Sequence, residues 1–306
     1  MALFEGISAF PITPADEHGV VDVEGVARLV THLADARVDS IGLLGSTGTY
    51  AYLSRTERRR ALRAAVKAVA GRTPLMVGVG SLRTDDAQDL ARDAEAEGAD
   101  GLLMAPVSYT PLTQDEAFEH YVAVAATTRL PLCIYNNPGT THFNFSPALL
   151  DRLAEVPNIA AVKMPLPANC AINADLADMR ARTMSKLAIG YSGDWGMADA
   201  LLAGADAFYS VLAGFLPAQA MAIAKSAADQ DRHEVARVDR QLARLWELFR
   251  ELGSLRVAYV AAAELSLATV TPPRPILPVS ADDQRRIAKA LWMTTGDEAE
   301  PPEVAA

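Results

Sequence analysis

The segments Leu132-Cys-Ile-Tyr135 and Ile159-Ala-Ala-Val-Lys-Met164 frame the unit that decides the fold. Both are short and almost wholly apolar, which is typical of strands covered on both faces. Between them, Ser146-Pro147 fits a helix start with a serine cap and a proline at the first helical position. The stretch is therefore predicted as strand, helix and parallel strand, because parallel neighbours need a crossover of a dozen or more residues.

The same unit recurs along most of the chain. Candidate strands begin 20 to 35 residues apart, which leaves room for one helix and two loops in each interval. Ser54-Arg-Thr-Glu57 and Thr113-Gln-Asp-Glu116 both fit a capping box at a helix start. The predicted strands are Gly6–Phe10, Ser40–Leu44, Leu75–Val79, Gly101–Ala105, Leu132–Tyr135, Ile159–Met164, Leu187–Tyr191 and Ala207–Val211.

These near-uniform units predict an α/β fold, a closed (β/α)8 TIM barrel, rather than an open sheet. After residue 226 the strands stop and the apolar residues follow a helical period, as at Val235, Val238 and Leu242. We therefore expect a barrel over 1–226, a C-terminal helical domain over 227–294 and a loose tail over 295–306.

The composition limits the classes of function. The chain of 306 residues has 28 Lys and Arg against 38 Asp and Glu, a net charge of −10, which disfavours nucleic acid or an anionic membrane as partner. The N-terminus does not resemble a signal peptide, and no stretch is a convincing membrane span, so a cytoplasmic location is expected. Two cysteines and five unpaired histidines predict neither a disulfide framework nor a metal site.

Lys163 is the first candidate for chemistry. It is the one lysine of five that is embedded near the end of an apolar strand, where active-site groups of barrels lie. A buried, unpaired ammonium tends to lose its proton, and a neutral amine can attack a carbonyl to form a Schiff base. The alternative is a lysine whose charged end reaches solvent or pairs with a carboxylate.

Tyr135 ends the preceding strand, so strand pairing predicts that it lies beside Lys163. A phenol next to an imine carbon can relay protons, although a lone strand tyrosine is more often a core residue. Gly45-Ser-Thr-Gly-Thr49 follows the second strand and lacks nucleotide-loop spacing; it suits a small carboxylate, or is a tight turn. Asp194 and Trp195 follow the seventh strand and are expected either to line the barrel mouth or to cap the next helix.

Together these motifs resemble the pyruvate-dependent class I aldolases of the dihydrodipicolinate synthase and N-acetylneuraminate lyase group. The resemblance covers about 290 residues, and its order and spacing are more specific than any single motif. It rests on Gly45-Ser-Thr-Gly48, Tyr135-Asn-Asn-Pro138, Val162-Lys163, Ser192-Gly-Asp194 and Leu201-Leu-Ala-Gly-Ala-Asp206.

The resemblance implies roles for individual residues. Lys163 becomes the Schiff-base lysine and Tyr135 the proton relay, while Ser46 and Thr47 hold the carboxylate of the keto acid and the backbone at Tyr209 lines the same pocket. It also implies a homotetramer that needs no cofactor and no metal, with a pyruvate-like 2-oxo acid and an aldehyde as substrates.

Three departures from the family pattern bear on the substrate. Thr140 stands where dihydrodipicolinate synthases carry an arginine that binds the carboxylate of the aldehyde substrate. Ser108 stands at the position of the relay tyrosine that reaches into the neighbouring subunit, and Tyr109 next to it is a possible substitute. Thr49 replaces the glutamate of the Gly-Thr-Thr-Gly-Glu motif.

The sequence therefore predicts a metal-independent Schiff-base lyase that condenses pyruvate with an aldehyde or cleaves a 4-hydroxy-2-oxo acid. Without the arginine, the lysine-pathway reaction is not the favoured one, since a lost bidentate arginine costs about 2–4 kcal/mol. The alternatives are a dehydratase or hydratase-aldolase acting on a 2-oxo sugar acid through the same imine, an authentic 4-hydroxy-tetrahydrodipicolinate synthase despite the missing arginine, and a non-catalytic barrel that binds a keto acid.

Overall fold

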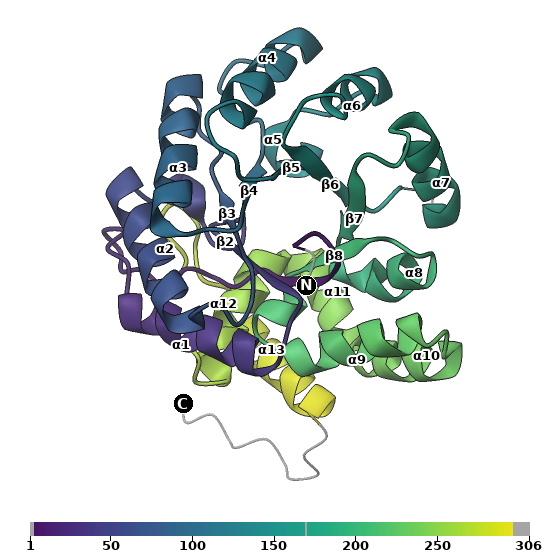
Figure 1. Cartoon of the computed structure of the whole chain (residues 1–306). Helices are drawn as coiled ribbons and strands as arrows, with labels where there is room; N and C mark the ends of the chain where they lie inside the picture. The colour runs from purple at the N-terminus through teal and green to yellow at the C-terminus, as the bar shows by residue number, and fades with distance from the viewer. Residues whose placement is uncertain (1–2, 169, 296–306) are drawn as a thin grey trace.

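The computed structural model describes residues 3–168 and 170–295. Its strands form a closed parallel barrel in which each strand pairs with its sequence neighbours and β8 pairs with β1 (Figure 1). The TIM barrel predicted from the sequence is confirmed, and each predicted strand end lies within one residue of the observed one. The strands are β1 (Gly6–Ala9), β2 (Ser40–Leu43), β3 (Leu75–Gly78), β4 (Gly101–Met104), β5 (Leu132–Tyr135), β6 (Ile159–Pro165), β7 (Ala188–Ser192) and β8 (Ala207–Ser210).

Three strands are each preceded by an aspartate that bonds to the backbone of an adjacent strand. Asp39, Asp100 and Asp206 each precede the first residue of a strand by one position. Each accepts a hydrogen bond from a backbone N–H of an adjacent strand, at 2.8 Å from Ile7, Leu75 and Ile189 respectively. The carboxylates thus satisfy amides at the strand ends that would otherwise be left unpaired.

Helices surround the barrel in the outer ring seen in Figure 1. The predicted capping box forms at Thr113. At Ser54 only half of it forms, because the Glu57 carboxylate accepts from the backbone N–H of Val21 instead. The helices of this ring are α1 (Val23–Asp35), α2 (Arg55–Val69), α3 (Thr84–Glu97), α4 (Gln114–Ala125), α6 (Pro147–Leu153), α7 (Ile172–Arg182), α8 (Met197–Leu202) and α9 (Pro217–Ala228). The short helix α5 (Pro138–Thr141) lies in the segment between β5 and α6.

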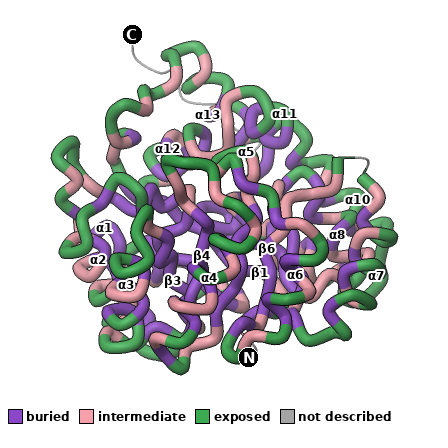
Figure 2. The backbone as a smooth tube through the Cα atoms, turned by 90° about the horizontal axis from the view of Figure 1, so that it is seen from above, coloured by how far each residue is buried: buried purple, intermediate pink, exposed green. Residues whose placement is uncertain are grey.

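The remaining helices are α10 (Arg232–Gln241), α11 (Ala243–Leu252), α12 (Ser254–Glu264) and α13 (Ala281–Thr295). Figure 2 shows α11, α12 and α13 at one end of the barrel, opposite the end at which the chain enters β1. They therefore lie at the end where the parallel strands finish. The division into two domains at residue 226 stays a prediction, and α9 runs across that position. Residues 296–306 of the predicted tail lie outside the described residues.

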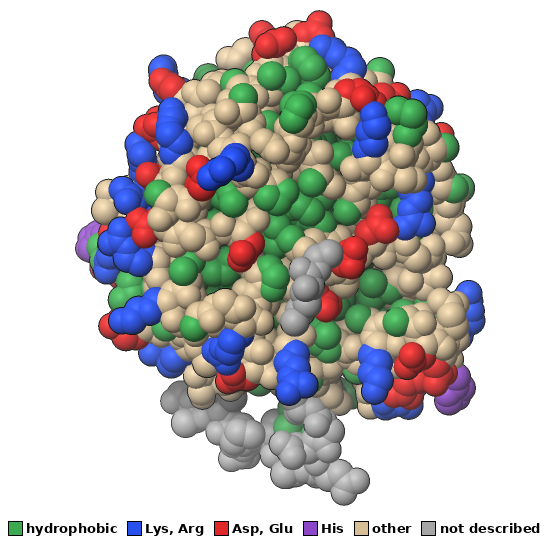
Figure 3. Space-filling model, viewed as in Figure 1, with side chains coloured by type: hydrophobic (Ala, Val, Ile, Leu, Met, Phe, Trp, Pro, Cys, Tyr) green, Lys and Arg blue, Asp and Glu red, His purple; other side chains and the backbone are tan. Residues whose placement is uncertain are grey.

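Two separate sets of buried side chains form the core. The larger set packs the outer faces of the strands against the helices. The smaller set fills the inside of the barrel and contains Phe4, Phe10, Met76, Leu103, Ala105, Cys133, Tyr135, Ala161, Ala207 and Tyr209. On the face seen in Figure 3, hydrophobic side chains gather near the centre beside several acidic ones, and Lys and Arg lie mostly toward the rim. None of the described helices is long and apolar enough to cross a membrane.

A glycine in β3 allows the loop after β2 to pass close to the barrel. A Cβ atom added at Gly78 would lie 1.8 Å from the backbone oxygen of Leu44, which has no flexible side chain to move away. Leu44 itself has a left-handed backbone, with φ of +53°, at the start of this loop.

We therefore expect Gly78→Ala to lower the free energy of unfolding by about 1–3 kcal/mol, the range for overpacking in a core. Urea denaturation measures this change. The matched control is Gly139→Ala, because nothing lies within 4 Å of the added atom there. That variant should stay within about 0.5 kcal/mol of the parent. Equal stability of the two variants would contradict the proposed contact.

Candidate active site

Lys163 lies inside the barrel near the end of β6 and is only 4% exposed. Three aromatic rings surround its amine. The Nζ atom lies 3.7 Å from the ring centroid of Phe10, 4.3 Å from that of Tyr135 and 5.5 Å from that of Tyr209. Such surroundings replace water with carbon, which disfavours the charged form of an amine.

Burial lowers the pKa of Lys163 from 10.5 to about 7. Nearby Cys133 and Asp194 act in the opposite direction but are outweighed by the loss of solvent. Ring faces also attract a cation, so the three aromatic side chains oppose part of the desolvation. A substantial fraction of the amine is therefore neutral near pH 7, as a nucleophilic lysine requires.

Tyr135 and Lys163 are register partners on the neighbouring strands β5 and β6, as the strand pairing predicts. Burial raises the pKa of Tyr135, while its interactions with Ser46 and Asn137 oppose that rise. Asn137 donates a hydrogen bond from Nδ2 to the phenol oxygen of Tyr135 at 3.0 Å. The phenol is therefore kept protonated and oriented beside the amine.

The loop after β2 brings Ser46 and Thr47 to the same end of the barrel. Thr47 is buried, Ser46 is half-buried, and Ser46 interacts with Tyr135 across the barrel. The backbone N–H of Thr49 donates to the backbone carbonyl oxygen of Ser46 at 3.1 Å, and Thr49 has a left-handed backbone with φ of +52°. A β-branched residue in this conformation is strained, and such strain is typical of functional sites.

Asp194 was expected to line the barrel mouth or to cap the next helix, but its side chain is buried against the segment after β8. Its side chain is 1% exposed and accepts bonds from the Ser210 hydroxyl at 2.5 Å and from the Leu212 N–H at 3.0 Å. Burial raises the pKa of Asp194 despite these bonds. The aspartate therefore fastens the loop after β8, whereas Trp195, which is 39% exposed, lies at the surface.

Three of the predicted site residues lie in the segments that follow β4 and β5. Thr140 is exposed on the short helix α5, where its hydroxyl accepts from Asn137 Nδ2 at 2.9 Å. Ser108 is half-buried, and Tyr109 is 96% exposed and projects into solvent. Tyr209, by contrast, contributes its side chain as well as its backbone, because its ring is 1% exposed inside the barrel.

Sequence reasoning missed Phe10 and Cys133. Phe10 follows β1 directly and has the ring nearest to the amine. Cys133 is two residues before Tyr135 on the same strand, and its sulfur lies 3.5 Å from the Tyr209 hydroxyl. The alternation of side chains along a strand would have placed Cys133 inside the barrel once Tyr135 was placed there.

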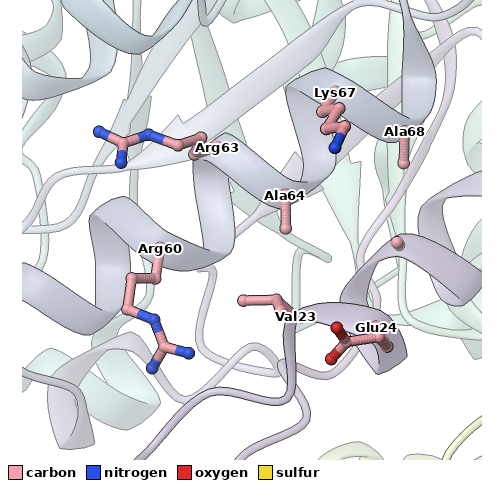
Figure 4. Close-up of a pocket in the computed structure, with 8 residues that line it drawn as sticks. Val23, Glu24, Arg60, Arg63, Ala64, Lys67 and Ala68 are labelled. Atoms are coloured by element: carbon pink, nitrogen blue, oxygen red, sulfur yellow. The ribbon is translucent and has the colours of Figure 1, made fainter.

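A large surface groove has no part in this arrangement. It measures about 540 Å³ and lies between α1 and α2 on the outside of the barrel (Figure 4). Both arginines that line it are engaged in ion pairs, Arg60 with Glu57 and Arg63 with Glu97. Among the described residues, no group of three His, Cys, Asp or Glu side chains is placed to hold a metal ion.

Comparisons with known proteins point to one family. The sequence pattern of the Dihydrodipicolinate synthetase family matches residues 3–293. A 4-hydroxy-tetrahydrodipicolinate synthase from Alkalilimnicola ehrlichii is 31% identical over 291 residues, which cover 94% of this chain and 98% of that protein.

Solved structures agree with this comparison. A dihydrodipicolinate synthase from Agrobacterium tumefaciens is 55% identical, covers 95% of this chain and 98% of its own, and superposes with a TM-score of 0.94. A chloride-inhibited dihydrodipicolinate synthase from Acinetobacter baumannii, complexed with pyruvate, is 25% identical with a TM-score of 0.86 over 95% of this chain and 99% of its own.

Because the pKa of Lys163 is lower in the folded protein than in the unfolded chain, the free energy of unfolding depends on pH. Below pH 7 the lysine is charged in both states, so the folded protein carries the full desolvation penalty. Between about pH 7 and 10.5 the unfolded chain binds more protons, so this penalty shrinks as the pH rises and is absent above that window.

Lys163→Met should therefore be more stable than the parent at pH 6, by a margin of a few kcal/mol that disappears toward pH 10. Urea denaturation at pH 6, 8 and 10 measures this difference. Lys67→Met, at an exposed position on α2, serves as the control and should follow the parent at every pH. A margin that is constant with pH would show that Lys163 keeps an ordinary pKa.

Proposed function

The chain belongs to the dihydrodipicolinate synthetase family, and from this membership we propose how its residues act in a pyruvate-condensing class I aldolase. The chain is a lyase of the Schiff-base type, as its family is. The observation that carries the assignment is the buried amine of Lys163 with its pKa lowered to about 7, in register with Tyr135. The expected cytoplasmic location stays a prediction.

We assign the nucleophile to Lys163. Its neutral amine adds to the C2 carbonyl of pyruvate, and loss of water from the carbinolamine gives an imine that is protonated on nitrogen. The positive nitrogen then accepts the electron pair of a C3–H bond as that proton leaves, which gives an enamine. The C3 carbon attacks the aldehyde carbon, the aldehyde oxygen gains a proton, and water releases the product from Lys163.

We assign the proton transfers to Tyr135. Its phenol lies beside the amine, and burial keeps it protonated until it donates to the departing hydroxyl of the carbinolamine. Ser46 and Asn137 both interact with the phenol and orient it. Ser46 and Thr47 are also the residues that we assign to the pyruvate carboxylate, because their loop is next to Tyr135 at the same end of the barrel.

The chemistry of the second substrate is inferred from the polar residues at the mouth of the barrel, here called the rim, and not from the amine of Lys163. Thr140 leaves no cation at the position where the resemblance expects an arginine. We therefore propose an aldehyde without a carboxylate at that position, in preference to aspartate semialdehyde. Formation of a homotetramer, with Tyr109 entering the site of a neighbouring copy, would explain why this aromatic side chain is 96% exposed.

The imine assignment is tested by trapping. The protein incubated with pyruvate and reduced with borohydride should gain one reduced pyruvyl group, mapped to Lys163, and Lys163→Ala should gain none. The rate of trapping should fall about tenfold per pH unit below about pH 7 and level off above it, since it follows the neutral amine. An adduct on another lysine, or a rate still rising steeply above pH 8, would contradict the assignment.

In the same experiment, Tyr135→Phe separates the proton transfer assigned to Tyr135 from the nucleophilic attack assigned to Lys163. Without its hydroxyl the proton relay is lost, so trapping should slow by about 10²–10⁴-fold while Lys163 remains the modified residue. A variant that traps at the parent rate would remove Tyr135 from the mechanism.

The preference for the aldehyde is tested by restoring the charge. Thr140→Arg should raise kcat/KM with aspartate semialdehyde by at least about tenfold, because a charge-assisted bond to its carboxylate contributes about 1.5–3 kcal/mol. Thr140→Leu is the matched control and adds bulk without charge, so it should give no gain. Ordinary turnover of the parent chain with aspartate semialdehyde would refute the proposed preference.

A further inference from the structure

Phe10 lies closer to the reacting amine than any other ring of the site. Its backbone N–H continues the pairing of β1 with β8 by donating to the Ser210 oxygen at 2.8 Å. The ring is 2% exposed and its centroid is 3.7 Å from Lys163 Nζ, against 4.3 Å for Tyr135. The mechanism above gives this ring no task.

The Phe10 ring also packs closely against two glycines. A Cβ atom at Gly42 would lie 2.3 Å from the ring atom Cζ, and one at Gly45 would lie 2.7 Å from Cδ1. Gly42 belongs to β2, and Gly45 opens the loop that carries Ser46 and Thr47. The ring therefore spans from the loop assigned to the carboxylate of the keto acid to the amine of Lys163.

Tyr209 holds the ring from a second direction. The two rings meet edge to face, with centroids 6.0 Å apart and an angle of 87°. Tyr209 is itself seated on a glycine, because a Cβ atom at Gly190 would lie 2.5 Å from its ring. Phe10 thus has neighbours on β2, on β8 and at Lys163, and has little room to move aside.

From this geometry we propose that Phe10 determines the size of the 2-oxo acid. Its ring forms the floor on which the carbonyl carbon of the acid must lie when it bonds to Lys163 Nζ, so the site takes the methyl group of pyruvate and rejects longer homologues. The inference rests on the proposed imine at Lys163. A floor that cannot yield penalises one extra methylene by about 10–200-fold in apolar pockets.

The test compares borohydride trapping of pyruvate with trapping of 2-oxobutanoate, which is longer by one methylene. The parent chain should trap pyruvate at least about tenfold faster. Phe10→Ala should lower this ratio about tenfold through a faster reaction with 2-oxobutanoate. Phe10→Leu, which disturbs the core less, should change the ratio in the same direction and keeps the test informative if the alanine variant does not fold.

The matched control is Phe208→Leu. Phe208 is a fully buried phenylalanine of β8 that packs on the outer face of the barrel and not inside it. This variant should lose comparable stability with no change in the ratio. A change as large as that of Phe10→Leu would mean that the ratio reports loosened packing, and it would overturn the inference.

A compensating pair tests the contact itself. Gly42→Ala should drive the Phe10 ring toward the amine and slow trapping of pyruvate severalfold, and adding Phe10→Leu should restore it. Failure of this rescue, or a parent chain that traps both acids at the same rate, would overturn the inference. Absence of any adduct in the parent chain would instead contradict the Schiff-base assignment, which keeps the two failures distinct.

Discussion

The removal of water from one amine is the constraint on which this site depends. An ammonium in bulk water is a poor nucleophile because its lone pair is occupied by a proton, and solvent at the site would keep it so. Lys163 is inside the barrel with three rings around it, and burial lowers its pKa to about 7. Burial of Lys163 thus lowers the stability of the fold and keeps a fraction of the amine neutral at physiological pH.

Glycines in neighbouring strands and in the loop after β2 make this enclosure possible. A barrel interior has a fixed width, so a large side chain on one strand requires a small one beside it. Gly42 and Gly45 make room for Phe10, and Gly190 makes room for Tyr209. Two polar groups near the amine are already engaged. Asp194 binds the loop after β8, and the Cys133 thiol, with its pKa raised to about 12 by burial, remains protonated. Because this carboxylate is committed to other donors, no ion pair within the described residues fixes the proton on Lys163.

The strands and the two reactive residues could be predicted from the sequence, because each depends on a local pattern. Short apolar segments at even spacing predict the barrel. The pairing of Tyr135 with Lys163 follows because one residue ends β5 and the other lies near the end of β6. Phe10 could not be found in this way, since its importance comes from contacts with residues more than thirty positions away, including Gly42. Asp194 was expected to line the barrel mouth or to cap the next helix because it follows β7, but its hydrogen-bond partners come from β8 and the loop beyond. Thr140 and Tyr109 were identified only as departures from a family pattern.

The site therefore has two parts that obey different physics. The floor, formed by the Phe10 ring, is apolar and tightly packed, so one additional methylene on the substrate is penalised. It governs which keto acid can reach Lys163. The rim carries the half-buried Asn137 and the exposed Thr140, where hydrogen bonds and charge decide the partner and packing does not. Because Asn137 bonds to both the Tyr135 phenol and the Thr140 hydroxyl, a change at the rim reaches the proton relay through one shared amide group. Substitutions at the rim should thus alter the choice of aldehyde and the proton transfer together, whereas substitutions in the floor should alter the choice of keto acid while the aldehyde preference is retained.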